Sequence, residues 1–341
     1  MKNTFGFGII GCGVISRWHA RSVLELEGAR LVGVTDNRIE NAQKFAEEFP
    51  CKVYESLEEM LACPEIDIVS ICTPSGLHAP IAVQAAQTKK HIVVEKPMAI
   101  TREQVADMVR ACEENQVKTA VISQLRFTPS IRRVKEAVEK GELGKILLGD
   151  VYMKYYRSPE YYDSATWRGT WALDGGGALM NQGIHGIDVL QYLVGPVKSV
   201  FGSCKTLARD IEVEDTASVV VEYENGAIGT IQGTTSVEPG YPRVIEISGT
   251  RGTIVLKEDV IIRWDVDGKQ LDESQIPKGN VESFRDPAGF AIDNHKMQIQ
   301  DLMEAIREDR PPLVDIYEGK KPVEIILAAY ESSESGRKID L

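Results

Sequence analysis

The first residues that could do chemistry form a glycine-rich turn near the start of the chain. An apolar, strand-like run at 5–10 leads into Gly11-Cys12-Gly13-Val14-Ile15-Ser16, which opens a helical pattern. Gly11 would allow a tight turn, and Gly13 would let the backbone approach a pyrophosphate at the helix N-terminus, where free N–H groups favour negative charge. Ser16 replaces the third glycine of a dinucleotide fingerprint, and its small side chain still permits close packing. The turn therefore predicts a dinucleotide site, with a purely structural turn as the alternative.

An acidic residue after the second strand-like run, 31–35, strengthens this prediction. Asp36 lies 25 positions after Gly11, near where a carboxylate would accept hydrogen bonds from the adenosine ribose. Because this carboxylate would repel the 2′-phosphate of NADP, NAD is the expected cofactor. Arg38 keeps NADP as an alternative, since its guanidinium could pair with that phosphate.

Two further segments follow strand-like runs and should border the crevice where ligands bind in open α/β sheets. The first is Thr73-Pro74-Ser75, and the second is Glu95-Lys96-Pro97. We interpret His78, which opens the next helix, as a capping or cofactor-contact residue rather than a catalyst. The expected cofactor contacts are Gly11, Gly13, Val14, Ile15, Asp36, Asn37, Arg38, Thr73, Pro74, His78, Glu95, Lys96 and Pro97.

A long predicted helix, about 177–194, carries a row of polar residues on an otherwise apolar sequence. Asn181, His185 and Asp188 follow one another at i, i+4 and i+7, so they should share one face of an α-helix. Glycines at 175–177 and 183 indicate close approach to another backbone or to a ligand. The alternative is a stripe of polar side chains that faces solvent.

The chemistry that this row could perform is the removal or addition of a hydride at a carbinol carbon. Such a step needs a base for the hydroxyl proton, and histidine titrates near neutral pH, so His185 is the candidate. Lys96 would place a positive charge beside the oxygen, which stabilises a developing alkoxide and lowers the pKa of neighbouring groups.

Aromatic and arginine residues ahead of this helix are candidates for substrate binding, because aromatic faces stack on sugar rings and arginines fork onto carboxylates or phosphates. Their pairing suggests a pyranose that bears an acidic or nucleotide group. Taken one at a time, these residues could equally belong to the core or the surface. His295, at the start of a late helix, is interpreted as structural. The candidate substrate contacts are Gln124, Arg126, Tyr156, Trp167, Arg168, Asn181 and Asp188.

Composition limits the partners of the chain. The 341 residues carry a formal net charge of −12, which repels polyanions and argues against nucleic acid or an anionic membrane as a partner. The first residues lack the apolar stretch of a signal peptide or membrane span, so we expect a cytoplasmic protein. The six cysteines form no Cys-x-x-Cys pair, and we expect no metal site and no disulfide framework.

The order of apolar runs predicts two domains. In the first third, strand-like runs alternate with helical stretches, which predicts a doubly wound parallel sheet over 1–124. The rest, 125–341, is rich in strand-like runs separated by turn signals, and it predicts a second α/β domain with a large, mainly antiparallel sheet. Late helices are expected near 290–308 and 321–335, the last of them able to pack back on the first domain.

As a set, these motifs resemble the Gfo/Idh/MocA oxidoreductase family, named after glucose-fructose oxidoreductase and inositol 2-dehydrogenase. The resemblance covers essentially the whole chain. It rests on the glycine-rich turn, on Thr73-Pro74 with His78, on Glu95-Lys96-Pro97, and on the stretch from Gly175 to Asp188.

The resemblance implies a Rossmann domain followed by an α/β domain whose open sheet often forms an oligomer interface, hence a homodimer or homotetramer. It also implies hydride transfer between a nicotinamide and a secondary alcohol of a sugar, nucleotide sugar or inositol. Lys96 would be the active-site lysine, with a cis bond before Pro97, and His185 the acid/base. Many members carry Asp where this chain has Asn181, which can hold a hydroxyl or orient His185 but cannot accept a proton. An NAD-dependent glycosidase that uses transient oxidation and a non-catalytic NAD sensor remain alternatives.

Overall fold

The computed structural model describes residues 4–268 and 292–341. Backbone contacts divide the chain into two compact units, the first formed by 1–124 and 291–320 and the second by 125–290 and 321–341. The sequence-based division into 1–124 and 125–341, with a last helix able to pack back on the first domain, stays a prediction. Contacts group a late segment, 291–320, with the first unit.

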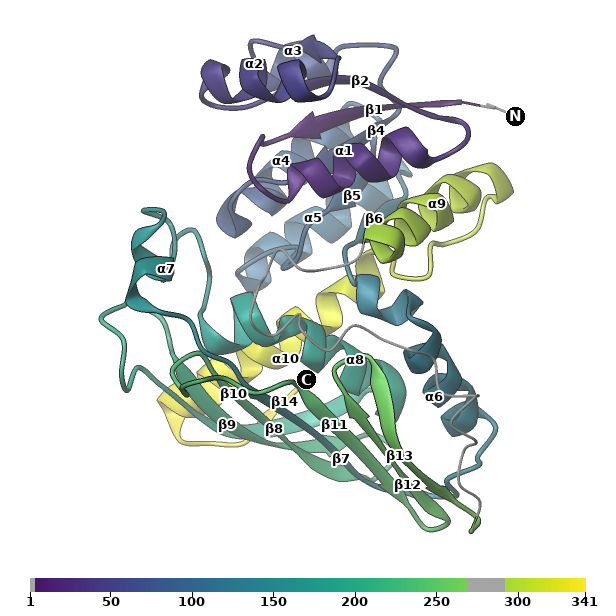
Figure 1. Ribbon diagram of the computed structural model, residues 1–341, viewed down its shortest axis with the longest axis vertical. Helices are drawn as coiled ribbons and strands as arrows, with labels where there is room; N and C mark the ends of the chain where they lie inside the picture. The colour runs from purple at the N-terminus through teal and green to yellow at the C-terminus, as the bar shows by residue number, and fades with distance from the viewer. Residues whose placement is uncertain (1–3, 269–291) are drawn as a thin grey trace. The chain divides into compact units, whose positions relative to one another are not determined.

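The first unit is built on a six-stranded parallel sheet with the order β3-β2-β1-β4-β5-β6 (Figure 1). From β1 the chain adds β2 and β3 on one side and then β4, β5 and β6 on the other, as in a doubly wound nucleotide-binding fold. The predicted fold class is confirmed. The strands are β1 (Phe5–Ile10), β2 (Ala29–Thr35), β3 (Lys52–Val53), β4 (Ile68–Ile71), β5 (His91–Val94) and β6 (Thr119–Val121). The sequence prediction missed only the two-residue β3.

Helices cover this sheet because its central strands, β1 and β4, are buried on both faces. Val23 of the first helix and Leu302 of the helix after residue 291 meet Phe7 and Ile68 in one buried cluster, so a segment from the end of the chain completes the core of the first unit. The helices of this unit are α1 (Ser16–Glu25), α2 (Ile39–Glu48), α3 (Leu57–Leu61), α4 (His78–Gln87), α5 (Arg102–Asn115) and α9 (Ile292–Glu308).

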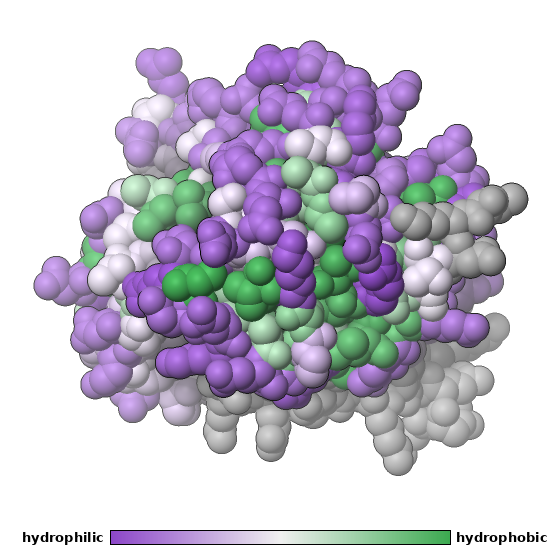
Figure 2. All heavy atoms as spheres, turned by 90° about the horizontal axis from the view of Figure 1, so that it is seen from above, coloured by the Kyte–Doolittle hydropathy of each residue, from purple (hydrophilic) through white to green (hydrophobic). Residues whose placement is uncertain are grey.

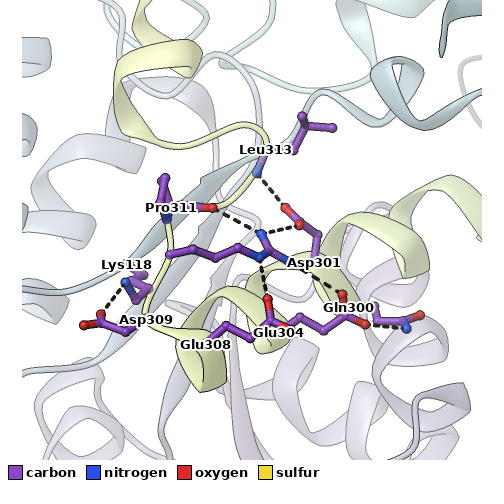
Figure 3. A network of polar contacts seen from close by, with 9 residues as sticks. Lys118, Gln300, Asp301, Glu304, Glu308, Asp309, Pro311 and Leu313 are labelled. Carbon is purple, nitrogen blue, oxygen red and sulfur yellow. Dashed lines mark hydrogen bonds and ion pairs between the residues drawn. The ribbon is translucent and has the colours of Figure 1, made fainter.

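An ionic network fixes the chain where α9 ends (Figure 3). The Arg310 guanidinium binds Asp301 through Nη1 at 2.8 Å and Glu308 through Nε at 2.8 Å. Asp301 also accepts the Leu313 N–H at 2.7 Å, and Lys118 pairs with Asp309 at 2.9 Å. These contacts turn the chain sharply after α9 and hold it beside β6.

The second unit is built on an eight-stranded sheet with the order β13-β12-β11-β7-β10-β9-β8-β14. Only β7 and β10 pair in parallel, so the predicted large, mainly antiparallel sheet is confirmed. The strand β8 was not predicted. The strands are β7 (Ile146–Lys154), β8 (Val197–Lys205), β9 (Thr216–Tyr223), β10 (Ile228–Thr234), β11 (Val244–Gly249), β12 (Gly252–Lys257), β13 (Val260–Val266) and β14 (Ile339–Asp340).

Figure 1 shows the long helices of the second unit on one side of its sheet. Residues of β9 alternate accordingly: Val219 and Val221 are buried, whereas Val220 between them is exposed. The helices are α6 (Pro129–Glu139), α7 (Pro159–Asp163), α8 (Ile184–Val194) and α10 (Ile316–Ser335). The first residues of α10, up to Lys320, belong to the first unit.

Figure 2 shows one face on which hydrophilic residues dominate and apolar residues gather toward the middle. None of the described helices combines the length and the apolar sequence that crossing a membrane requires. All six cysteines are free thiols.

Candidate active site

The glycine-rich turn has the geometry that the fingerprint predicts. Gly11 has φ +89°, and a Cβ there would lie 2.9 Å from the Cys72 carbonyl oxygen, so the fold itself requires glycine. A Cβ on Gly13, in contrast, would meet nothing within 4 Å. The protein therefore leaves open space at Gly13, where a dinucleotide phosphate would approach the start of α1. Val14, beside it, is an exposed apolar residue.

Asp36 joins this turn to the end of β2. Its carboxylate accepts the Cys12 N–H at 2.8 Å, the Arg38 N–H at 2.9 Å and the Asn41 side-chain amide at 3.1 Å. The carboxylate is half-buried, and a carboxylate can accept about four hydrogen bonds, so it can still bind a ribose hydroxyl. Asn37 and Arg38 are exposed beside it.

The segments after β4 and β5 are tied together through His78. Its ring nitrogens lie 2.7 Å from the Pro97 carbonyl oxygen and 2.8 Å from that of Thr73. Burial lowers the pKa of His78, so a neutral ring donates to one of these carbonyls. The Thr73 hydroxyl is buried without a hydrogen-bond partner, while Pro74 is half-buried. A polar ligand at this edge of the sheet would satisfy that hydroxyl.

Glu95 differs from its predicted role as a cofactor contact. It points into the unit, where His19 Nε2 donates to its Oε1 at 2.9 Å and His295 Nε2 lies 3.8 Å away. Lys96, the next residue, is half-buried, and its bond to Pro97 is cis, as the resemblance implied. The Glu95 carboxylate is therefore buried behind Lys96, and it accepts the Lys96 backbone N–H.

In the second unit, the predicted α-helix starts as a π-helix over Ala178–Gly183, and only α8 after it is α-helical. The i, i+4 spacing of Asn181 and His185 therefore does not describe one α-helical face. Asn181 donates from its amide to Asp174, and its Oδ1 accepts from Gln182 at 2.9 Å. These bonds fix which end of the Asn181 amide faces which neighbour. His185, the second residue of α8, is buried.

Arg126 and Asp188 bind one another instead of facing a ligand. The guanidinium donates to the carboxylate through Nε at 2.9 Å and through Nη2 at 2.6 Å, and both side chains are at most 2% exposed. The Arg126 guanidinium also stacks on Tyr192, 4.5 Å from the ring centroid. The prediction that these two residues contact substrate is replaced by a structural interpretation: the pair fixes α8, and so His185, against the segment that precedes α6.

A cluster of arginines and aromatic rings lies ahead of the π-helix. The Arg168 guanidinium lies 4.2 Å from the centroid of Tyr161 and 4.7 Å from that of Trp167. Arg209 lies 5.1 Å from the ring of Tyr156. Nε of Arg168 and Nε of Arg209 are buried without a hydrogen-bond partner. This arginine–aromatic cluster is the part of the second unit best suited to an anion.

Two glycines before the π-helix, Gly176 and Gly177, approach other parts of the protein closely. A Cβ on Gly177 would lie 2.1 Å from the Glu214 carbonyl oxygen, and one on Gly176 would lie 2.1 Å from the Tyr330 hydroxyl. The Glu214 carboxylate accepts N–H groups of Gly177 at 2.9 Å and Leu179 at 2.8 Å, and the Tyr330 hydroxyl at 2.8 Å. Burial raises the pKa of Glu214 to about 7. The glycines thus let the chain wrap a buried carboxyl group.

Sequence reasoning missed Tyr161, Asp174, Gln182 and Glu214. Tyr161 lies close in sequence to residues that were singled out, and its aromatic ring could have suggested it. No sequence signal marks either carboxylate: Glu214 acts through backbone N–H groups more than 30 positions away, and Asp174 through a backbone N–H and an amide within seven positions. Gln124 lies in the first unit, buried, with its Oε1 unpartnered.

Comparisons with known proteins agree with this geometry. Residues 5–123 match the model for the oxidoreductase family with an NAD-binding Rossmann fold, and residues 131–255 match the GFO/IDH/MocA C-terminal domain. The chain belongs to the Gfo/Idh/MocA oxidoreductase family.

Relatives extend the match over the whole chain. The WlbA dehydrogenase from Bordetella pertussis, solved with NADH and UDP-GlcNAcA, is 34% identical with a TM-score of 0.89 over 100% of this chain and 99% of that chain. The myo-inositol 2-dehydrogenase of Thermotoga maritima is 26% identical over 98% of each chain. The scyllo-inositol 2-dehydrogenase (NAD(+)) of Bacillus subtilis is 26% identical over 100% of this chain and 97% of that one. The chain is thus an NAD(P)-dependent dehydrogenase of the class that acts on CH–OH groups of sugars and related polyols.

Proposed function

We propose that this enzyme uses NAD to oxidise a secondary hydroxyl of a sugar that carries an anionic group, such as a nucleotide-linked sugar. The observation that carries the substrate class is the arginine–aromatic cluster, with two buried Nε donors that lack partners. Aromatic faces suit sugar and base rings, and guanidinium groups suit phosphate or carboxylate oxygens. The relative that shares 34% identity was solved with a nucleotide sugar, which supports this choice over an inositol.

For the cofactor, the residues of the first unit fit a dinucleotide. The open space at Gly13, the half-buried carboxylate of Asp36 and the unpartnered Thr73 hydroxyl provide for a pyrophosphate, a ribose diol and a further polar group. When bound, NAD would supply the hydride acceptor at its nicotinamide ring. The negative charge of Asp36 favours NAD over NADP.

Lys96 and His185 are the proposed catalytic residues. His185 would take the proton of the substrate hydroxyl as the hydride leaves the same carbon, and Lys96 would stabilise the negative charge that develops on the oxygen. Asn181 would hold a substrate hydroxyl, because Asp174 and Gln182 fix the orientation of its amide. Many family members have a carboxylate at position 181. In this chain the nearby carboxylate is that of Asp174, which accepts a hydrogen bond from the Asn181 amide.

A spectrophotometric screen at the absorbance of reduced nicotinamide tests the proposal. Nucleotide-linked sugar acids, uronic acids, neutral sugars and inositols would each be incubated with NAD or with NADP. We expect NADH to accumulate with an anionic sugar substrate. A clear preference for an inositol would contradict the substrate class, and product release without net NADH would favour the glycosidase alternative. Binding of NAD without any turnover would favour the sensor.

An arginine variant tests the site itself. Arg168→Ala should raise KM for the anionic substrate by about tenfold or more with little change in kcat, since charge-assisted hydrogen bonds contribute about 1.5–3 kcal/mol. The matched control is Arg263→Ala, which removes an exposed arginine that pairs with Asp265 on β13. Equal effects of the two variants would contradict the assignment.

The second unit is also the proposed surface for assembly into a homodimer or homotetramer. The side of the eight-stranded sheet opposite the long helices exposes apolar residues in adjacent strands, among them Phe201, Val220 and Ile228. Exposed apolar residues clustered on one face favour association. The assembly would be built by pairing this face with that of a second copy.

A further inference from the structure

Three buried titratable side chains meet in the first unit behind the proposed catalytic lysine. Glu95 precedes Lys96, His19 belongs to α1, and His295 belongs to α9. His19 is fully buried, His295 is 1% exposed, and the Glu95 side chain is 8% exposed. Nothing in the proposed reaction uses the two histidines, although burying such groups together is costly unless they are paired.

The hydrogen bonds of this cluster have a defined direction. An ionised carboxylate only accepts, so His19 Nε2 donates to Glu95 Oε1 at 2.9 Å. The other ring nitrogen of His19, Nδ1, lies 2.8 Å from the Ser70 hydroxyl of β4. The second oxygen of Glu95 accepts the backbone N–H of Lys96 at 3.2 Å. One carboxylate thus joins α1, β4 and the lysine backbone.

The surroundings of Glu95 keep its charge. Burial alone would raise the pKa of this carboxyl, but the His19 and His295 rings hold it well below its usual range. The other titratable groups that sense this charge are Cys72, whose pKa burial and Glu95 raise, and His78, whose pKa burial lowers. At neutral pH a fixed negative charge therefore lies one residue from Lys96.

We infer that His19 and His295 are positioning residues, which fix the Glu95 carboxylate and through it the backbone and charge environment of Lys96. The inference rests on the proposed function of Lys96. The inference gives α9 a role in the site: although this helix lies near the end of the sequence, it places His295 beside Glu95. It also links the lysine to α1, the helix that begins at the glycine-rich turn, so the cofactor and lysine sites share one support.

The same three residues also offer nitrogen and oxygen atoms within 4.8 Å of one another, a spacing that a metal ion could use. We favour the hydrogen-bonded arrangement for two reasons. The 2.9 Å separation between His19 and Glu95 is that of a hydrogen bond. Nδ1 of His295 is buried without a partner, whereas a metal-bound histidine almost always donates its other N–H to a neighbour.

The test compares His19→Leu and His295→Leu with His19→Gln and His295→Gln, which keep an N–H donor. We expect the leucine variants to lose about tenfold or more in kcat, with KM for NAD nearly unchanged, because misplaced catalytic groups slow the chemical step. The pH profile of kcat should shift in the leucine variants, and the glutamine variants should recover much of the activity. The control is His91→Leu, at the opposite end of β5, where the ring accepts the Lys118 N–H at 2.9 Å. It should lower stability without moving the pH profile.

A readout without substrate separates this inference from the proposed function. In protein labelled at the lysine side chains, NMR would follow the titration of Lys96, assigned by its loss in Lys96→Met. We expect a lower pKa for Lys96 in His19→Leu, because a carboxyl group that loses its donor protonates more easily and offers less negative charge. An unchanged Lys96 titration in a folded His19→Leu variant would overturn the inference, even if wild type oxidises sugars. The inference would also be overturned if wild type bound one equivalent of zinc and the His19→Leu variant did not.

Discussion

At the scale of single residues, Asp36 shows how a carboxylate that holds the fold together could also bind a ligand. It accepts three N–H groups from the protein and still presents free acceptor capacity at the edge of the sheet. Its charge would attract a ribose diol and repel a 2′-phosphate, whereas exposed Arg38 would do the reverse. We expect the balance between these two side chains to set the preference between NAD and NADP.

Replacing Asp36 should change that preference. We expect Asp36→Ser to raise KM for NAD by about tenfold and to lower KM for NADP, because the variant removes the repulsion and leaves Arg38 to pair with the phosphate. Steady-state kinetics with both cofactors measure this. Glu40→Ser, an exposed acid in the first turn of α2, is the control. If wild type already prefers NADP, the assignment of Asp36 is wrong.

Glu214 makes the stability of the protein depend on pH. Burial raises its pKa from 4.5 to about 7, so the folded protein holds this proton more tightly than the unfolded chain does. Between about pH 4.5 and pH 7 the unfolded chain has lost the proton and the folded protein has not. The free energy of unfolding contributed by this group therefore falls as pH rises through that window and levels off above it, a change of about 3 kcal/mol for a shift of this size.

Chemical denaturation of wild type and Glu214→Gln from pH 5 to pH 8 checks this. The glutamine cannot ionise, so its variant should lack the wild-type decline with rising pH. Its absolute stability should be lower, because an amide NH2 would oppose one of the backbone N–H groups of Gly177 and Leu179. Parallel pH profiles for the two proteins would show that Glu214 titrates normally.

Residue types at the ends of strands were the most predictable part of the site. Asp36, Thr73 and Lys96 follow apolar runs directly, and the sequence alone places them at the ligand-binding edge. The roles of Glu95 and Asp174 were not predictable, because they depend on partners brought together by folding. For Glu95 the decisive partner, His19, is 76 positions away.

At the scale of elements, two glycines of one turn are required for different reasons. Gly11 has a left-handed backbone and contacts the end of β4, whereas Gly13 faces open space. We expect Gly11→Ala to lower the free energy of unfolding by about 1–3 kcal/mol. Gly13→Ala should leave stability unchanged and weaken NAD binding by about tenfold.

Thermal denaturation and NADH fluorescence titration separate these two effects. Each variant serves as the control for the other, since both place a methyl group in the same turn. A loss of stability in Gly13→Ala without a change in NADH affinity would mean that this glycine serves the fold and that the turn does not face the cofactor.

Periodicity predicted the first unit well because most of its strands are apolar runs that alternate with helical patterns. It failed at the π-helix, where Glu214 and Asp174 hold the chain in a wider turn than the α-helical spacing assumes. It also missed β8, whose alternation is weak: Ser199 is buried in it while Phe201 is exposed. Cross-strand pairing with β9 defines this strand, and one sequence segment does not reveal its partner.

At the scale of the whole molecule, the chain leaves its first unit at residue 124 and returns to it from residue 291 to 320. Composition gave no sign of this return, since the helix 292–308 is an ordinary amphipathic helix. The side chains that it packs against place this helix in the first unit: Ile299, Leu302 and Met303 pack with Phe5 and Phe7 of β1. A truncation before α9 would therefore expose the core of the first unit and remove His295 from Glu95.

The open face of the eight-stranded sheet carries the last prediction. Val220 pairs with Phe201 of β8 and with Thr230 of β10, and its side chain is 53% exposed on the face away from the helices. If two copies associate through this face, Val220→Lys would bury a positive charge in the contact, which is unfavourable without a partner. Analytical ultracentrifugation should then show an oligomer for wild type and a single chain for the variant. Leu24→Lys, an equally exposed position on α1, should leave the oligomer intact. A wild-type monomer, or an oligomer that tolerates Val220→Lys, would mean that this face serves another purpose.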